Sequence, residues 1–171
     1  LASNLGARVI VWGSPKQRLI HDKSYEECFH IATKFFNSLG DYALEKDVVI
    51  GFEPNAKVYG CDFCFTAKQA VELIRAAKSN GFRLHLDTGN MHLEKDDIGS
   101  ILKENMDLLC HVQVSEPFLG GFDKPLVDHK IFSENLRKFN YAGILSIEMR
   151  KGKDSLLSIA QAVAHVTTEY Y

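Results

Sequence analysis

Short apolar runs alternate with longer segments of helical periodicity along the whole chain. The runs are rich in Val, Ile, Leu and Phe and are bounded by Gly, Pro, Asn or Asp, which is typical of buried strands. They predict strands at residues 7–12, 47–52, 82–86, 108–114 and 143–149. Apolar residues three or four positions apart predict helices at residues 25–44, 66–79, 96–106, 128–139 and 154–170. Because a helix follows every strand, the strands are expected to run parallel.

Two parallel architectures fit this α/β alternation, an open doubly wound sheet and a (β/α) barrel. A dinucleotide-binding sheet is expected to carry a glycine-rich turn after its first strand. That turn is Gly13-Ser14-Pro15-Lys16 here, and the chain contains no GxGxxG. A barrel is favoured because polar residues close four successive strands, and barrel loops bring such residues to one axial pocket. At 171 residues, without a linker, the chain is interpreted as a single domain, residues 1–171.

Four polar side chains stand at or near the ends of the predicted strands. They are Glu53, Asp87, His111 and Glu148, each after a short apolar run. Carboxylate oxygens are favoured by hard divalent ions such as Mn²⁺ and Mg²⁺, and one imidazole suits Mn²⁺ or Co²⁺. Strand alternation places Gln113 on the same face as His111. The pattern therefore predicts a divalent-metal site built from neighbouring strands.

Composition and charge restrict the classes of partner. A net charge of −2 and an isoelectric point near 6.4 give no general attraction to nucleic acid or to an anionic membrane. No apolar run reaches the length of a membrane span, and four cysteines are too few for a disulfide scaffold, so a cytoplasmic location is expected. Cys61 and Cys64 have CxxC spacing, but no second such pair completes a zinc site.

The strand-end motifs resemble those of the xylose-isomerase-like TIM-barrel superfamily of sugar epimerases and isomerases, including the D-tagatose and D-psicose 3-epimerases. The motifs are VWGSPKQR after the first strand, EPN after the second, LDTGN after the third, HVQVSE after the fourth and IE in the last. The resemblance covers essentially the whole chain. It implies that the strands are strands four to eight of a (β/α)8 TIM barrel. An N-terminal part of about three βα units, roughly a hundred residues, is then expected to be missing.

The resemblance also implies an activity, that of an isomerase or epimerase of a small sugar or sugar derivative. Such enzymes remove a proton from carbon next to a carbonyl, and one divalent metal stabilises the developing charge. By position, Glu53 and Glu148 are the acid–base pair and also metal ligands, whereas Asp87 and His111 are ligands only. Mn²⁺ is the expected metal, with Mg²⁺ and Co²⁺ as alternatives. A homo-oligomer is implied by analogy with the family. The candidate substrate-binding residues are Arg18, Asn90, His92, Glu116 and Arg150.

Two departures from the family pattern leave the substrate open. Asn90 stands where a His often follows the Asp, and no Arg follows His111 within HVQVSEPFLGG, so that Arg150 is the nearest candidate. Three other functions remain open: an endonuclease-IV-like apurinic nuclease with Zn²⁺, a dehydratase of cyclic polyols, and an inactive barrel remnant. The negative net charge argues against the nuclease, as does a strand-end set that holds only one of the seven histidines.

Overall fold

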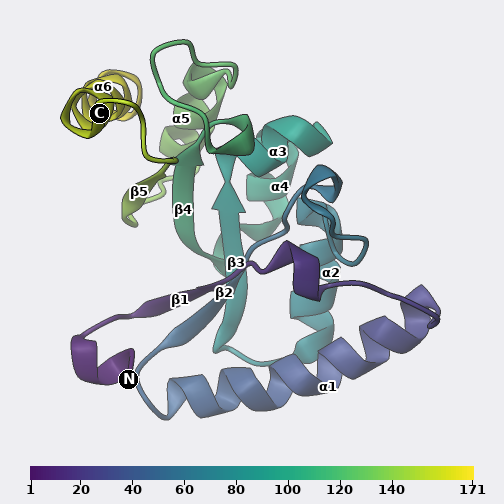
Figure 1. The fold of residues 1–171 in the computed structure, drawn as a ribbon. Coiled ribbons are helices and arrows are strands. Elements are labelled where there is room, and N and C mark those ends of the chain that lie inside the picture. Colours follow the sequence, from purple (N-terminus) through teal and green to yellow (C-terminus); the bar gives the residue numbers. More distant parts are fainter.

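The computed structural model describes all residues, Leu1–Tyr171, and shows a curved parallel sheet with helices packed on one side (Figure 1). The strands are β1 (Val9–Trp12), β2 (Val49–Phe52), β3 (Phe82–Asp87), β4 (Leu109–Ser115) and β5 (Leu145–Glu148). They lie side by side in chain order, and each pair of neighbours is parallel. An order without reversal belongs to a barrel, because a doubly wound sheet changes direction at a switch point. The fold is therefore a partial (β/α) barrel, as predicted.

The predicted helices are all present, and their ends differ from the prediction by only a few residues. The α-helices are α1 (Tyr25–Leu44), α2 (Ala67–Ala77), α3 (Thr88–Glu94), α4 (Ile98–Asn105), α5 (His129–Lys138) and α6 (Ser155–Tyr170). Capping boxes begin α1 and α2: the hydroxyls of Ser24 and Thr66 accept hydrogen bonds from the backbone N–H groups of Glu27 and Gln69. These local signals explain why the two helices begin where the sequence predicts.

Helix α3 has no counterpart among the predicted helices. It begins with Thr88, Gly89 and Asn90, which are weak helix formers. The Asp87 side chain caps the helix by accepting a hydrogen bond from the Asn90 N–H at 2.7 Å. The Thr88 hydroxyl donates to the carbonyl of Ser115 on β4 at 2.7 Å. Tertiary contacts therefore hold α3, and they place its first turn beside the end of β3.

The main core lies between the sheet and the helices that cover it. The rings of Phe36 on α1 and Phe82 on β3 stack with their centroids 4.2 Å apart, and Phe52 on β2 meets both edge-on. Such pairs contribute about 0.5–1.5 kcal/mol beyond their buried area. Gly81 lets the turn before β3 approach α1 closely, since a Cβ there would meet the Gly40 carbonyl oxygen. These contacts fix α1 and β3 relative to each other.

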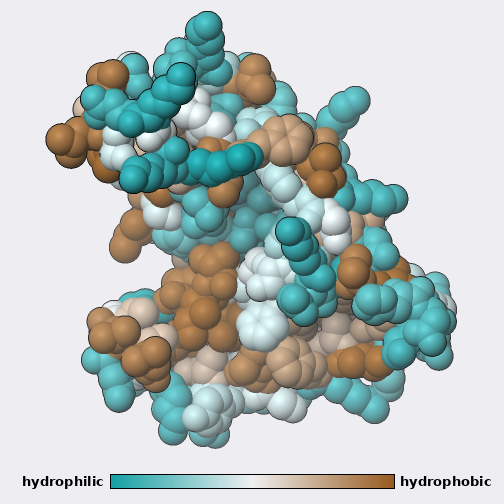
Figure 2. All heavy atoms as spheres, viewed as in Figure 1, coloured by the Kyte–Doolittle hydropathy of each residue, from teal (hydrophilic) through white to brown (hydrophobic).

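Both edges of the sheet end without a neighbouring strand. β1 and β5 are the terminal strands, and the side chains of Ile10 and Ile144 near them are 38% and 75% exposed. Figure 2 shows hydrophobic surface over β1, whereas hydrophilic residues gather around the loops after β4 and β5. A closed barrel has no such edges, because every strand in it is paired on both sides. No helix in the chain combines the length and the apolar character needed to cross a membrane.

Candidate metal centre

Three of the four predicted metal ligands meet at the carboxyl end of the sheet. Glu53 follows β2, Asp87 ends β3 and Glu148 ends β5, so parallel pairing brings all three to one edge. One carboxylate oxygen from each residue lies within 4.8 Å of the other two. The side chains of Glu53 and Asp87 are buried, and Glu148 is half-buried. This group is called the carboxylate cluster below.

Asn90 on α3 holds two members of the carboxylate cluster in position. Its side-chain amide donates to Glu53 Oε1 at 2.9 Å, and its backbone N–H donates to Asp87 Oδ1 at 2.7 Å. The other Asp87 oxygen, Oδ2, is buried and has no hydrogen-bond partner. Unpartnered buried oxygens are rare and costly in folded proteins. A divalent cation would satisfy Oδ2, so the residues present fit the metal that the sequence predicts.

The close approach of three carboxylates shifts their protonation. Burial, and then the neighbouring Asp87 and Glu148, raise the pKa of Glu53 to about 8. Burial also raises the pKa of Asp87, and burial together with Asp87 raises that of Glu148. Like charges in a buried site disfavour the ionised forms, and a bound cation reverses that preference. The carboxylate cluster therefore favours either a proton or a metal ion.

The structure does not bring His111 to the carboxylate cluster. β4 continues four residues beyond His111. The register between β3 and β4 shifts near His85, so that His85, and not Asp87, pairs with His111. His111 lies deeper along the strand, where its Nε2 atom is 2.7 Å from the hydroxyl of Ser146. The residue that pairs with Asp87 is Gln113, whose Oε1 atom is 2.8 Å from His85 Nε2. Strand alternation predicts that Gln113 shares a face with His111. Only the register between β3 and β4 shows that Gln113 lies beside Asp87.

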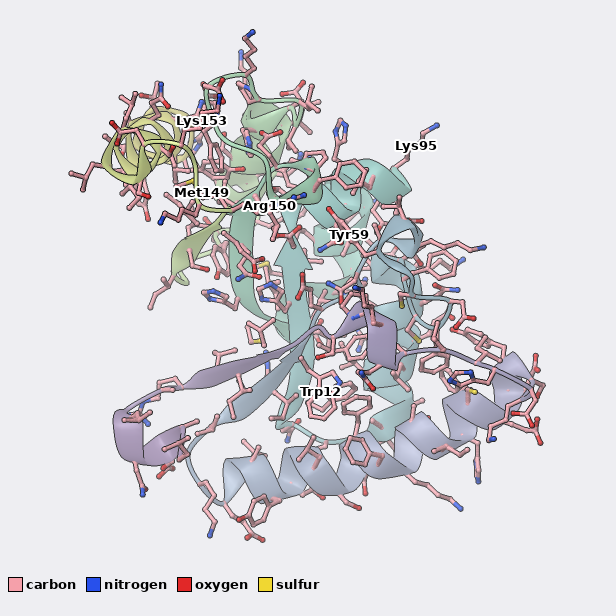
Figure 3. All side chains as sticks on the ribbon, in the orientation of Figure 1. Trp12, Tyr59, Lys95, Met149, Arg150 and Lys153 are labelled. Carbon is pink, nitrogen blue, oxygen red and sulfur yellow. The ribbon has the colours of Figure 1, made fainter.

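Two of the predicted substrate-binding residues lie at or beside the carboxylate cluster. Asn90 lines a pocket of about 330 Å³ together with the three carboxylates. Arg150 follows β5 and is tied to the loop after β4: its backbone N–H donates to the Leu119 carbonyl at 2.9 Å, and its Nε donates to the Phe118 carbonyl at 2.7 Å. Figure 3 shows Arg150 on the side of the molecule that carries Tyr59.

The other three predicted substrate-binding residues lie elsewhere. Arg18 is buried over the Phe52 ring, and its guanidinium donates to Asn55 Oδ1 and to the Cys64 carbonyl. His92 is exposed on the far side of α3, in a different pocket. Neither residue lines the pocket of the carboxylate cluster, although Arg18 contacts Asn55, which does. Sequence spacing does not show which way a loop or helix residue points.

Glu116, the third of these residues, is also turned away from the carboxylate cluster. Its side chain is 3% exposed and lies 2.7 Å from His129 Nε2. Its second oxygen accepts hydrogen bonds from the backbone N–H groups of Leu126 and Val127. His129 Nδ1 in turn is 2.8 Å from the hydroxyl of Tyr170. Glu116 therefore holds the loop after β4 in place and does not line the pocket of the carboxylate cluster.

Further residues from the loops after β1 and β2 line the pocket around the carboxylate cluster. Lys16 and Asn55 come from the loops after β1 and β2, and Tyr59 comes from a short turn further along the second loop. A Cβ at Gly13 would lie 2.6 Å from Glu53 Oε2, so the absence of a side chain there leaves room for the Glu53 carboxylate. No motif in the sequence distinguishes Tyr59 from an ordinary loop tyrosine.

Comparison with known proteins places this site in a family. Residues 1–168 match the family model described as "Xylose isomerase-like TIM barrel". The chain belongs to this family. The family and the barrel fold predicted from the sequence are therefore confirmed. No curated protein sequence matches the chain.

Several solved structures share the fold. The 3-keto-D-glucoside 4-epimerase YcjR of E. coli has a TM-score of 0.81 at 21% identity, and the match covers 98% of this chain and 66% of that one. An L-ribulose 3-epimerase has a TM-score of 0.85 at 18% identity, with 99% and 63% covered. A D-psicose 3-epimerase studied with D-fructose has a TM-score of 0.80 at 17% identity, with 99% and 66% covered. The chain thus spans somewhat less than two thirds of the length of these structures, and at these identities the likeness shows the fold alone.

Proposed function

We propose that this chain carries the metal-binding and acid–base residues of a sugar isomerase or epimerase. The observation that carries the proposal is the carboxylate cluster, whose three carboxylates approach within 4.8 Å while Asp87 Oδ2 has no partner. An all-oxygen set suits Mn²⁺ or Mg²⁺, with Co²⁺ as a further candidate. Zn²⁺ usually takes nitrogen or sulfur ligands, and no imidazole joins this set. The ligand set therefore favours the isomerase hypothesis over the zinc nuclease hypothesis.

The positions of Glu53 and Glu148 in the carboxylate cluster suit them to transfer protons to and from a bound substrate. A divalent ion in the carboxylate cluster would supply charge stabilisation for a substrate oxygen. Glu148, which is half-buried at the edge of the sheet, is assigned the removal of a proton from carbon next to the substrate carbonyl. Glu53 is assigned the return of a proton to the same or the opposite face of that carbon. Asn90 positions Glu53 by donating a hydrogen bond to its carboxylate, and Asp87 is assigned to metal binding only.

The substrate is proposed to be a small sugar or sugar derivative. Supporting this class, the similar structures are described as epimerases of a keto-glucoside and of ketoses. Hydrogen-bonding groups around a pocket of about 330 Å³ come from Asn90, Lys16 and Tyr59. Arg150 does not line this pocket, but its backbone N–H donates to the carbonyl of Leu119, which does. Activity of the whole protein is part of the proposal, because the chain spans only part of the related structures. The cytoplasmic location and the homo-oligomer stay predictions.

Calorimetric titration of this chain with Mn²⁺ tests the metal centre. One Mn²⁺ per chain is expected, with binding weakened at least about tenfold in Asp87→Asn. Glu134→Gln, on the exposed face of α5, is the matched control and should bind as the parent does. Two or three Zn²⁺ per chain would instead favour the nuclease, and absence of any metal binding would favour an inactive remnant.

Turnover of D-fructose and D-psicose, measured with Mn²⁺ present, tests the acid–base assignment. Glu148→Gln is expected to abolish exchange of the substrate proton with solvent while the circular dichroism spectrum stays unchanged, because Gln keeps the shape of Glu but transfers no proton. Undiminished turnover in this variant would refute the role of Glu148.

A further inference from the structure

β4 runs between the two strands that end in Asp87 and Glu148, yet it contributes no carboxylate and no imidazole to the carboxylate cluster. Residues paired across parallel strands point to the same face of a sheet. The register pairs Asp87 with Gln113. It also pairs Glu148 with Ser115. The side chains of β4 that share a face with the two carboxylates are therefore those of Gln113, of Ser115 and, deeper along the strand, of His111.

Gln113 is the side chain of this face that is best placed to complete the ligand set. His111 lies two residues deeper, with its Nε2 atom 2.7 Å from the hydroxyl of Ser146. Ser115 is buried beside the start of α3, where its hydroxyl accepts a hydrogen bond from the Gly89 N–H at 3.1 Å. Gln113 is only half-buried, and it stands one strand spacing, about 4.8 Å, from the last residue of β3.

His85 sets the orientation of the Gln113 amide. The imidazole is fully buried, its Nε2 atom lies 2.8 Å from Gln113 Oε1, and its Nδ1 atom has no hydrogen-bond partner. A proton on Nδ1 would be a buried donor without an acceptor, whichever way the amide is turned. The proton is therefore on Nε2, and His85 donates to Gln113 Oε1.

A hydrogen bond from His85 leaves Gln113 Oε1 able to bind a cation. An amide oxygen has two lone pairs, and His85 occupies one of them. Metal ligands are commonly held by such a hydrogen bond from a neighbouring side chain, which fixes the direction of the ligand. Gln113 and His85 thus have the relationship that is expected of a ligand and the residue that orients it.

We propose that Gln113 Oε1, and not the imidazole of His111, is the fourth protein ligand of the metal centre. The role of Gln113 rests on the proposed function and defines the metal preference of that same site. Three carboxylates and one amide oxygen form an all-oxygen set, which suits Mg²⁺ and Mn²⁺. An imidazole in the fourth position would add affinity for Co²⁺ and Zn²⁺. Gln113 therefore narrows the margin by which these two ions outcompete Mg²⁺.

Calorimetric titration with Mg²⁺ and with Mn²⁺ tests the loss of the ligand. Gln113→Leu is expected to weaken binding of both ions at least about tenfold, because Leu has a similar size and no oxygen. His111→Leu removes the imidazole from the same face of β4 and should bind both ions as the parent does. Gln161→Leu makes the same change as the first variant at an exposed position on α6, and it should also leave binding unchanged.

A gain of affinity in Gln113→His tests the position independently, because misfolding cannot produce a gain. The ratio of Co²⁺ affinity to Mg²⁺ affinity is expected to rise at least about tenfold. The visible absorption of bound Co²⁺ should also shift, since a nitrogen ligand replaces an oxygen ligand. Gln161→His places the same imidazole away from the pocket of the carboxylate cluster and should show neither change.

Three outcomes would overturn the role of Gln113. They are unchanged Mg²⁺ and Mn²⁺ binding in Gln113→Leu, an equal or larger loss in His111→Leu, and an unchanged ratio of Co²⁺ to Mg²⁺ affinity in Gln113→His. If Gln113→Leu binds as the parent does while Asp87→Asn loses binding, the role of Gln113 fails and the metal centre stands. If neither the parent nor any variant binds an ion, the metal centre itself fails, and the role of Gln113 fails with it.

Discussion

Replacing Glu53 by Gln is expected to stabilise the metal-free chain at neutral pH. In that state burial, together with Asp87 and Glu148, raises the pKa of Glu53 to about 8, whereas its ordinary value in solvent is 4.5. A carboxyl group with a raised pKa binds its proton more tightly in the folded state. Its contribution to stability is therefore complete below pH 4.5 and declines as the pH rises towards 8. At about 1.4 kcal/mol per pH unit, the decline reaches about 3 kcal/mol at pH 7.

Gln at position 53 carries no titrating proton and keeps an oxygen that can accept the hydrogen bond from Asn90. The free energy of unfolding of Glu53→Gln should therefore match that of the parent near pH 4.5 and exceed it by about 3 kcal/mol at pH 7. Urea denaturation in EDTA, followed by circular dichroism at several pH values from 4.5 to 8, measures the difference. Glu134→Gln provides the control, since that side chain is exposed on α5.

Addition of Mn²⁺ should reverse the order of stability. A ligand that binds only the folded state at a hundred times its dissociation constant adds about 2.7 kcal/mol to the parent protein. Glu53→Gln lacks one carboxylate of the cluster and should gain much less. If the free energies of unfolding of parent and variant differ by the same amount at every pH between 4.5 and 8, the raised pKa of Glu53 is refuted. An equal gain from Mn²⁺ in both proteins would refute its role as a ligand.

Substitutions at three further positions probe how the fold is held together around the site. Gly81→Ala should lower the free energy of unfolding by about 2 kcal/mol or more in urea denaturation, because the new Cβ meets the Gly40 carbonyl oxygen; an unchanged midpoint would contradict this contact. Thr66→Ala should cost about 1 kcal/mol by removing the cap of α2, and Thr66→Ser should restore most of it; an equal loss in both variants would show that the hydroxyl is not responsible. Glu116→Gln should speed amide hydrogen exchange at Leu126 and Val127, since a neutral amide oxygen accepts hydrogen bonds more weakly than a carboxylate; unchanged exchange would show that other contacts hold the loop after β4.

The order and type of the elements follow from the sequence alone. Apolar runs of strand length, separated by segments of helical periodicity, require parallel strands with crossover helices, and local capping signals at Ser24 and Thr66 set where α1 and α2 begin. Parallel strands all point the same way, so residues at their carboxyl ends must gather at one edge. This is why the sequence predicts that Glu53, Asp87 and Glu148 form a group, as they do in the structure.

Only the tertiary structure decided where the other predicted site residues lie relative to that group. The register shift beside His85 and the extra length of β4 place Gln113, and not His111, at the level of Asp87. Contacts between elements distant in sequence turn Arg18 and Glu116 into the protein interior. Spacing along one strand shows which residues share a face, but pairing with the neighbouring strand sets how far along the barrel each one lies. The alternation of side chains is a local property, whereas the level of a side chain in the barrel depends on the strands on either side.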